Sequence, residues 1–161
     1  MNHEIISKVK GLACFCEPSE IEPLEGGITN INLRVKDRGV IYVVRLGENI
    51  PEHGVLRWNE LALSQAADSA GISPAVVHSE PGILVLQYLE ARPLTEAGVR
   101  DNLNFSRIVD LVKKAHKMLG KHLKTPVLTF WPFQVIRTYN KRLHDEKSQY
   151  TSILGKIMTD L

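Results

Sequence analysis

The hydrophobic period of this sequence changes twice within its first 90 residues, and the order of these changes most constrains the fold. Residues 31–35 alternate apolar and polar side chains, and residues 40–46 form a nearly continuous β-branched run, so both are expected to be strands. Residues 55–70 instead have the spacing of an amphipathic helix. Further extended patterns lie at residues 21–24, 74–78 and 83–86.

This order predicts an α+β domain, with one main helix packed on a five-stranded antiparallel sheet, over residues 1–89. After Leu89 the pattern becomes helical, and residues 90–161 are expected to form a linker and a set of helices. The last apolar stripe, within 150–161, is still running at the final residue. We therefore expect the sequence to be truncated within its helical part.

Composition and charge exclude several classes of protein. The net charge of +2 is too small to favour a nucleic-acid partner. No run approaches the roughly 18 apolar residues that cross a bilayer, so no membrane contact is expected. The first residues lack the basic and apolar regions of a signal peptide, which favours a cytoplasmic location. A basic set on the helical part fits a solvated helix face as well as a nucleic-acid surface; it comprises Lys113, Lys114, Lys117, Lys121, His122 and Lys124.

The two cysteines, Cys14 and Cys16, are separated by a single residue. A structural metal site would need two more ligands at suitable spacing, and none is nearby. We expect reduced thiols and no metal site in this chain.

The most distinctive local segment is the turn between the first two expected strands. Gly26 and Gly27 let the backbone approach a ligand closely, and Thr29 and Asn30 add short hydrogen-bonding side chains. Such a turn can present backbone N–H groups to phosphate oxygens. A plain hairpin turn has the same composition, so the segment alone leaves both interpretations open.

Three further residues could belong to the same site. Arg45 lies between apolar residues near the end of a strand, so its charge must face solvent, a cleft or a partner. Glu60 lies on the main helix, and if the two meet, their ion pair would hold the Arg45 guanidinium near phosphates. Gln87 begins the linker after the last strand, where backbone groups could bind a flat heterocycle. Two solvated charges and an ordinary linker are the alternatives.

The order of these features resembles the choline/ethanolamine kinase and aminoglycoside phosphotransferase superfamily, and bacterial choline kinase-like proteins in particular. The resemblance covers roughly residues 20–140. The matching segments are 24–32 (LEGGITNIN), 42–46 (YVVRL), 57–60 (RWNE), 70–74 (AGISP), 85–89 (VLQYL) and 111–116 (LVKKAH).

The resemblance implies a kinase-like N-lobe followed by the first helices of a helical C-lobe, and it implies a role for each matching residue. Arg45 would contact the α- and β-phosphates of ATP, and Glu60 would orient it. Gln87 and Leu89 would offer backbone groups to adenine. Four residues of the glycine-rich turn would cover the phosphates: Gly26, Gly27, Thr29 and Asn30.

The sequence departs from the family in its last part. A catalytic Asp followed by metal-binding Asn and Asp residues is expected there, and within 128–161 only His144 and Asp145 resemble the start of such a loop, with no Asn at the required spacing. We therefore assign no catalytic residue, and expect ATP, Mg²⁺ and a small amino alcohol such as choline to be used only by a complete enzyme. The alternative is a non-catalytic nucleotide- or protein-binding fragment that needs a partner chain, such as a complementary C-lobe.

Overall fold

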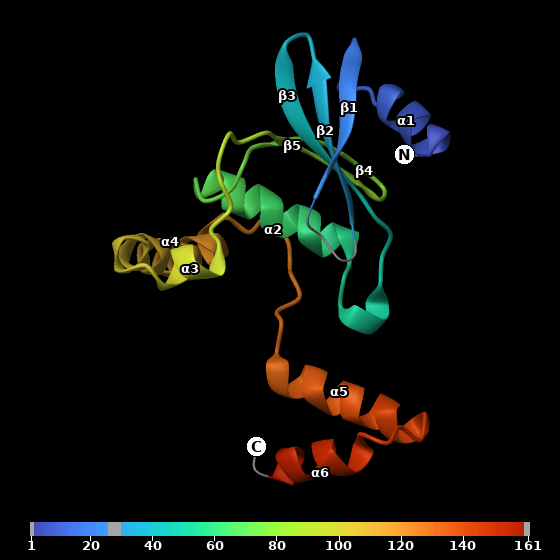
Figure 1. The fold of residues 1–161 in the computed structure, drawn as a ribbon, viewed down its shortest axis with the longest axis vertical. Coiled ribbons are helices and arrows are strands. Elements are labelled where there is room, and N and C mark those ends of the chain that lie inside the picture. The colour runs from blue at the N-terminus through green and yellow to red at the C-terminus, as the bar shows by residue number, and fades with distance from the viewer. Residues whose placement is uncertain (1, 26–29, 160–161) are drawn as a thin grey trace. The chain divides into compact units, whose positions relative to one another are not determined.

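The computed structural model describes residues 2–25 and 30–159, and its first part is built on a five-stranded antiparallel sheet (Figure 1). The strand order is β1-β2-β3-β5-β4, and every neighbouring pair is antiparallel. The predicted α+β class is therefore confirmed. The strands are β1 (Pro18–Leu24), β2 (Ile31–Asp37), β3 (Val40–Leu46), β4 (Val76–Glu80) and β5 (Ile83–Gln87).

The main helix, α2 (Arg57–Ser69), lies between β3 and β4 in the chain. A short 3₁₀ turn, η1 (Pro51–His53), precedes it, and α1 (His3–Lys10) precedes the sheet. The helical pattern after the sheet forms α3 (Glu96–Arg100), α4 (Asn102–His122), α5 (Pro132–Asp145) and α6 (Thr151–Thr159).

A two-residue turn fixes the register of the central hairpin. Arg38 and Gly39 both have positive φ, 48° and 83°, which is the conformation that matches the twist of a tight hairpin. The turn brings Asp37 opposite Val40, and the pairing then continues without a shift along both strands. Asn32 consequently lies directly opposite Arg45.

The two faces of the sheet have different neighbours. Alternate residues of the strands are buried against α1 and the segment after it, which supplies Val9, Leu12 and Phe15 to the core. Because side chains alternate along a strand, Arg45, between buried Val44 and Leu46, points to the opposite face, where α2 lies. The strand residues of this core are Leu33, Val35, Val44, Leu46, Ile83 and Val85.

The chain forms two compact units, residues 1–127 and 128–161. Helix α4 belongs to the first unit, where Lys114 Nζ donates to the carbonyl of Gly71 just after α2 at 3.1 Å. The compact units are defined by packing, whereas the predicted division into residues 1–89 and 90–161 separates a nucleotide-binding part from a helical part by function. That functional division stays a prediction. None of the described helices is long and apolar enough to cross a membrane.

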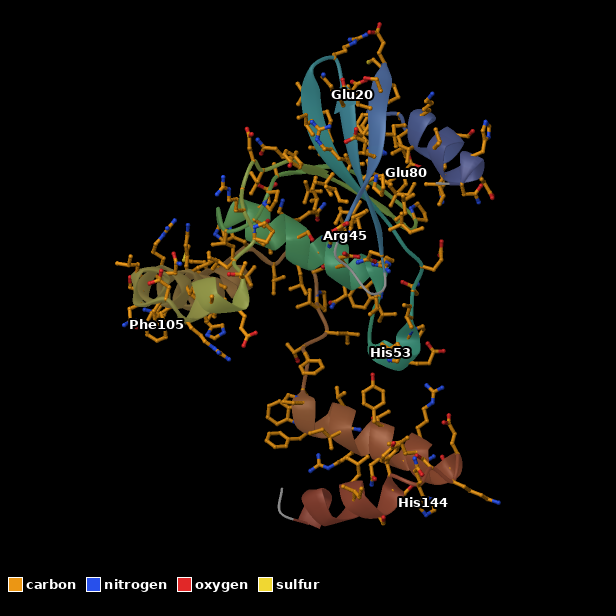
Figure 2. All side chains as sticks on the ribbon, in the orientation of Figure 1. Glu20, Arg45, His53, Glu80, Phe105 and His144 are labelled. Carbon is orange, nitrogen blue, oxygen red and sulfur yellow. The ribbon has the colours of Figure 1, made fainter. Side chains whose placement is uncertain are left out.

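The second unit consists of α5 and α6. His144 and Asp145 lie at the end of α5 (Figure 2), and Asp145 pairs with Lys141 one helical turn earlier at 3.0 Å. His144 and Asp145 therefore lie in a helix with an exposed ion pair, and not in a loop after a strand. Several large apolar side chains of the unit are exposed, among them Leu128, Phe130, Trp131, Tyr150 and Ile153.

Candidate functional site

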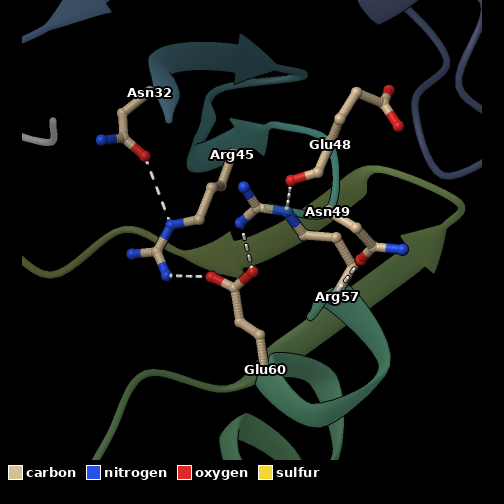
Figure 3. A network of polar contacts seen from close by, with 6 residues as sticks. All are labelled: Asn32, Arg45, Glu48, Asn49, Arg57 and Glu60. Atoms are coloured by element: carbon tan, nitrogen blue, oxygen red, sulfur yellow. Dashed lines mark hydrogen bonds and ion pairs between the residues drawn. The ribbon is translucent and has the colours of Figure 1, made fainter. Parts of the chain in front are cut away.

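The expected contact between Arg45 and Glu60 is present. Arg45 Nη1 lies 2.6 Å from Glu60 Oε1, joining β3 to the first turn of α2 (Figure 3). On its other side, Arg45 Nε donates to Asn32 Oδ1 at 3.3 Å. The guanidinium is thus held from β2 and from α2, and among the residues that the structure describes its second terminal nitrogen, Nη2, has no partner. That nitrogen remains able to bind an anion.

A second arginine holds the other oxygen of the same carboxylate. Arg57 Nη1 lies 2.7 Å from Glu60 Oε2. The Arg57 side chain also donates from Nε to the Glu48 carbonyl at 2.9 Å, and its backbone N–H donates to Asn49 Oδ1 at 2.8 Å. One carboxylate therefore bridges two guanidinium groups at the start of a helix, which leaves this cluster with a net positive charge.

The ionisation of Glu60 follows from these contacts. Burial by itself would raise the pKa of the Glu60 carboxyl, but hydrogen bonds and charges from Arg45 and Arg57 outweigh it and hold the pKa below its ordinary value. Glu60 is therefore ionised near neutral pH, as an orienting role requires.

The β3–α2 connection begins with a tightly packed glycine. Gly47 N–H donates to the Gly82 carbonyl at 3.0 Å, which ties this connection to the β4–β5 turn. A Cβ on Gly47 would collide with Arg57 Nη2 and lie 2.8 Å from Asn30 Oδ1. A residue without a side chain is needed at this point, so that the two polar side chains can approach the backbone.

A pocket of about 300 Å³ borders the cluster on the side of α2 and the β4–β5 turn. Arg45, Arg57 and Glu60 contribute charged groups to its lining, and Trp58 and Leu61 contribute apolar surface. The remaining lining residues are Gly47, Ser79, Glu80, Pro81, Gly82, Ile83 and Leu84.

The glycine-rich turn can be followed only in part. Gly26, Gly27 and Thr29 lie outside the described residues. Asn30 is half-buried, and its Oδ1 is inaccessible and has no hydrogen-bond partner among the described residues. The role of these four residues in covering phosphates stays a prediction.

The linker after β5 is partly engaged in the sheet. Gln87 N–H donates to the Ala75 carbonyl at 2.9 Å, so this amide is not offered to a heterocycle. Leu89 is exposed. Between them, the ring of Tyr88 lies 5.8 Å from the guanidinium carbon of Arg34 on β2. The adenine contacts assigned to Gln87 and Leu89 stay predictions.

The described residues do not build a metal site of their own. Nowhere in residues 2–25 and 30–159 do three or more His, Cys, Asp or Glu side chains come together in a way that could hold a metal ion.

Sequence reasoning missed three members of the cluster. Arg57 was seen only as part of a matching segment, although its position three residues before Glu60 is the spacing of a helical ion pair. Asn32 would have followed from the register of the two-residue turn. Asn49 gave no such signal, because its contact with the start of α2 depends on the path of the connection from β3.

The sheet, the main helix and their order match the N-lobe of kinase-like proteins. The chain has a choline/ethanolamine kinase-like fold. A solved structure of this fold is an ethanolamine kinase from Plasmodium vivax, with a TM-score of 0.63 and 19% sequence identity. The match covers 79% of this chain and 37% of that kinase, so the chain spans well under half of its neighbour's length. No protein-family model matches the sequence, and no curated protein matches it.

Proposed function

We propose that this chain supplies the ATP-binding part of a small-molecule kinase. The observation that carries the proposal is the Arg45 guanidinium, which Asn32 and Glu60 hold and whose Nη2 has no partner among the described residues. It occupies the strand before the main helix, the place where kinases hold the cation that binds ATP phosphates. Arg45 would bind the α- and β-phosphates, with Glu60 fixing its orientation.

Other residues would complete the nucleotide site. The carbonyl of Gln87 and backbone groups of Leu89 would meet the adenine, because the Gln87 N–H already donates to Ala75. Gly26, Gly27, Thr29 and Asn30 would cover the phosphates. Mg²⁺ would supply the charge neutralisation that phosphoryl transfer requires.

The acceptor in the complete enzyme would be the hydroxyl of choline or a similar amino alcohol. The fold shared with an ethanolamine kinase supports this class of substrate. The residues of the proposed nucleotide site include no base to orient that hydroxyl and no ligands for the metal. They would come from further residues of a longer protein or from another chain.

Calorimetry tests the nucleotide site directly. The 161-residue chain is titrated with MgATP, alongside Arg45→Ala and the control Arg100→Ala, whose side chain forms an exposed pair with Glu96. We expect binding that weakens about tenfold or more in the Arg45 variant, since charge-assisted hydrogen bonds to a phosphate are lost, and no change in the control. Absence of binding by a folded wild-type chain would exclude the proposal.

A second candidate function is partner binding without catalysis. The exposed apolar side chains of the second unit favour it, with Phe130 at 77% and Trp131 at 60% exposure. A complementary helical C-lobe is the partner we would test. Sedimentation of the chain with the C-lobe of a full-length kinase of this fold should show a complex that Phe130→Ser and Trp131→Ser abolish; unchanged sedimentation of both components would exclude this candidate.

A further inference from the structure

Arg57 occupies a helix position that is unfavourable for a cation. It is the first residue of α2, and the positive end of the helix dipole disfavours a cation in the first turn. The preceding residue, Leu56, provides no side-chain cap. A sequence that breaks a local rule commonly does so at a functional site, so the contacts of this residue are informative.

Those contacts immobilise both Arg57 and Glu60. The Arg57 guanidinium is held by Glu60 Oε2 at one nitrogen and by the Glu48 carbonyl at another, and only 14% of the side chain is exposed. Glu60 can therefore not rotate about its last bond without losing a charged partner on each oxygen. The other oxygen faces Arg45, so one carboxylate links Arg57 to Arg45.

A third nitrogen of Arg57 and the side-chain oxygen of Asn30 both approach Gly47. Arg57 Nη2 and Asn30 Oδ1, a donor and an acceptor, are both inaccessible, and neither has a hydrogen-bond partner in the described part of the chain. Both atoms lie close to the position that a Cβ on Gly47 would take. Arg57 thus pairs with the Glu60 carboxylate and shares its approach to Gly47 with Asn30, and both residues belong to the proposed nucleotide site.

We infer that Arg57 is a positioning residue of the candidate nucleotide site, which keeps Glu60 on Arg45 and so fixes the direction from which Arg45 meets a phosphate. The inference rests on the proposed function. Arg57 need not touch the nucleotide itself. Lysine would be a poor substitute, because a single ammonium cannot reach both Glu60 Oε2 and the Glu48 carbonyl in the fork geometry of a guanidinium.

NMR on the full chain without nucleotide tests the positioning step. Variants Arg57→Met and Arg57→Lys are compared with Arg100→Met, which removes an exposed i, i+4 pair. In Arg57→Met we expect the Glu60 carboxyl to titrate at higher pH than in the wild type and the Arg45 Nε–H to exchange faster with water. Arg57→Lys should fall between, and the control should change neither signal. Unchanged Glu60 and Arg45 signals in a folded Arg57→Met chain overturn the inference. If the Met variant does not fold, the same two signals are compared in Arg57→Lys, and unchanged signals there overturn it.

Nucleotide titrations of the same variants separate positioning from general damage. Arg57→Met should weaken MgATP binding about tenfold, the loss of roughly one charge-assisted hydrogen bond, and leave adenosine binding unchanged. Equal losses for ATP and adenosine would mean a collapsed site and would overturn the inference. A wild-type chain that binds neither ligand would refute the proposed function instead, and the NMR comparison would still decide whether Arg57 positions Glu60 and Arg45.

Discussion

Oε1 of Glu60 lies 2.6 Å from Nη1 of Arg45, and this contact links the central strand β3 directly to the main helix α2. With Arg57 on the second oxygen, one carboxylate neutralises part of two half-buried guanidinium groups. Removing the carboxylate would leave both cations without their partner, which costs more than the loss of an exposed ion pair.

We therefore expect Glu60→Gln to destabilise the chain by about 1–3 kcal/mol, since a neutral amide can hold neither guanidinium as an ion pair. Urea unfolding at neutral pH measures the effect. The matched control is Glu96→Gln, which breaks the exposed pair with Arg100 and should change the free energy of unfolding by less than about 0.5 kcal/mol. Equal effects of the two substitutions would contradict the structural role of Glu60.

The contribution of Glu60 should depend on pH in a defined direction. Hydrogen bonds from Arg45 and Arg57 outweigh burial and lower the pKa of the folded carboxyl below its ordinary value of 4.5. A depressed carboxyl pKa stabilises the folded state fully above the unfolded pKa, and this stabilisation is lost as pH falls through the folded pKa. The difference in unfolding free energy between the wild type and Glu60→Gln should hence be constant near neutral pH and shrink below about pH 4.5.

The exposed Glu20 carboxyl provides a contrast in the same experiment. Its pKa is also lowered, first by a hydrogen bond from Lys36, but water surrounds it. We expect added salt to weaken any acid dependence that Glu20 contributes far more than that of Glu60, because exposed charges are screened more strongly. Urea titrations of Glu20→Gln and Glu60→Gln at low and high salt would distinguish the two, and an equal salt dependence would be the contrary result.

Local patterns in the sequence predicted the strands and the main helix, but not how distant parts meet. The alternation at residues 31–35 and the β-branched run at residues 40–46 predicted two strands, and the structure pairs them in a register that the two-residue turn sets. Nothing local in the sequence indicates that Val9, on the helix before the sheet, enters the core of the sheet. Arg45 and Glu60 were proposed as a pair from spacing and resemblance, whereas the Asn49 contact arises only once the β3–α2 connection folds back.

Gly47 should tolerate no larger residue, although its backbone is not in the left-handed region. An alanine Cβ would collide with Arg57 Nη2 and approach Asn30 Oδ1 to 2.8 Å, so the guanidinium would have to move away from Glu60. We expect Gly47→Ala to destabilise by about 1–3 kcal/mol, as overpacking does.

Gly120 in α4 is the matched control for that substitution, because an added methyl group there would have nothing within 4 Å. Gly120→Ala should stabilise the chain by about 0.5–1 kcal/mol, since alanine loses less backbone entropy in a helix. Thermal unfolding of both variants checks the pair of expectations. Stabilisation by both would show that Arg57 is not packed against Gly47.

Asp37 should be essential for attaching the N-terminal segment to the sheet. It is only 7% exposed, and its Oδ1 accepts hydrogen bonds from the backbone N–H groups of Cys16 at 3.0 Å and Glu17 at 2.5 Å. Asp37→Ala would leave two backbone donors without their acceptor, and we expect a loss of about 1–3 kcal/mol. Asp37→Asn, which keeps an accepting oxygen, should lose less.

Hydrogen exchange locates the effect of that substitution. In Asp37→Ala the amides of Cys16, Glu17 and α1 should exchange faster, because the hydrogen bonds that hold this segment beside β2 are gone. Asp145→Ala, which removes an exposed partner of Lys141 in the second unit, should leave those amides unchanged. If α1 kept its protection in Asp37→Ala, the apolar packing of Val9 in α1 and of Leu12 just after it would be sufficient to hold this segment on the sheet.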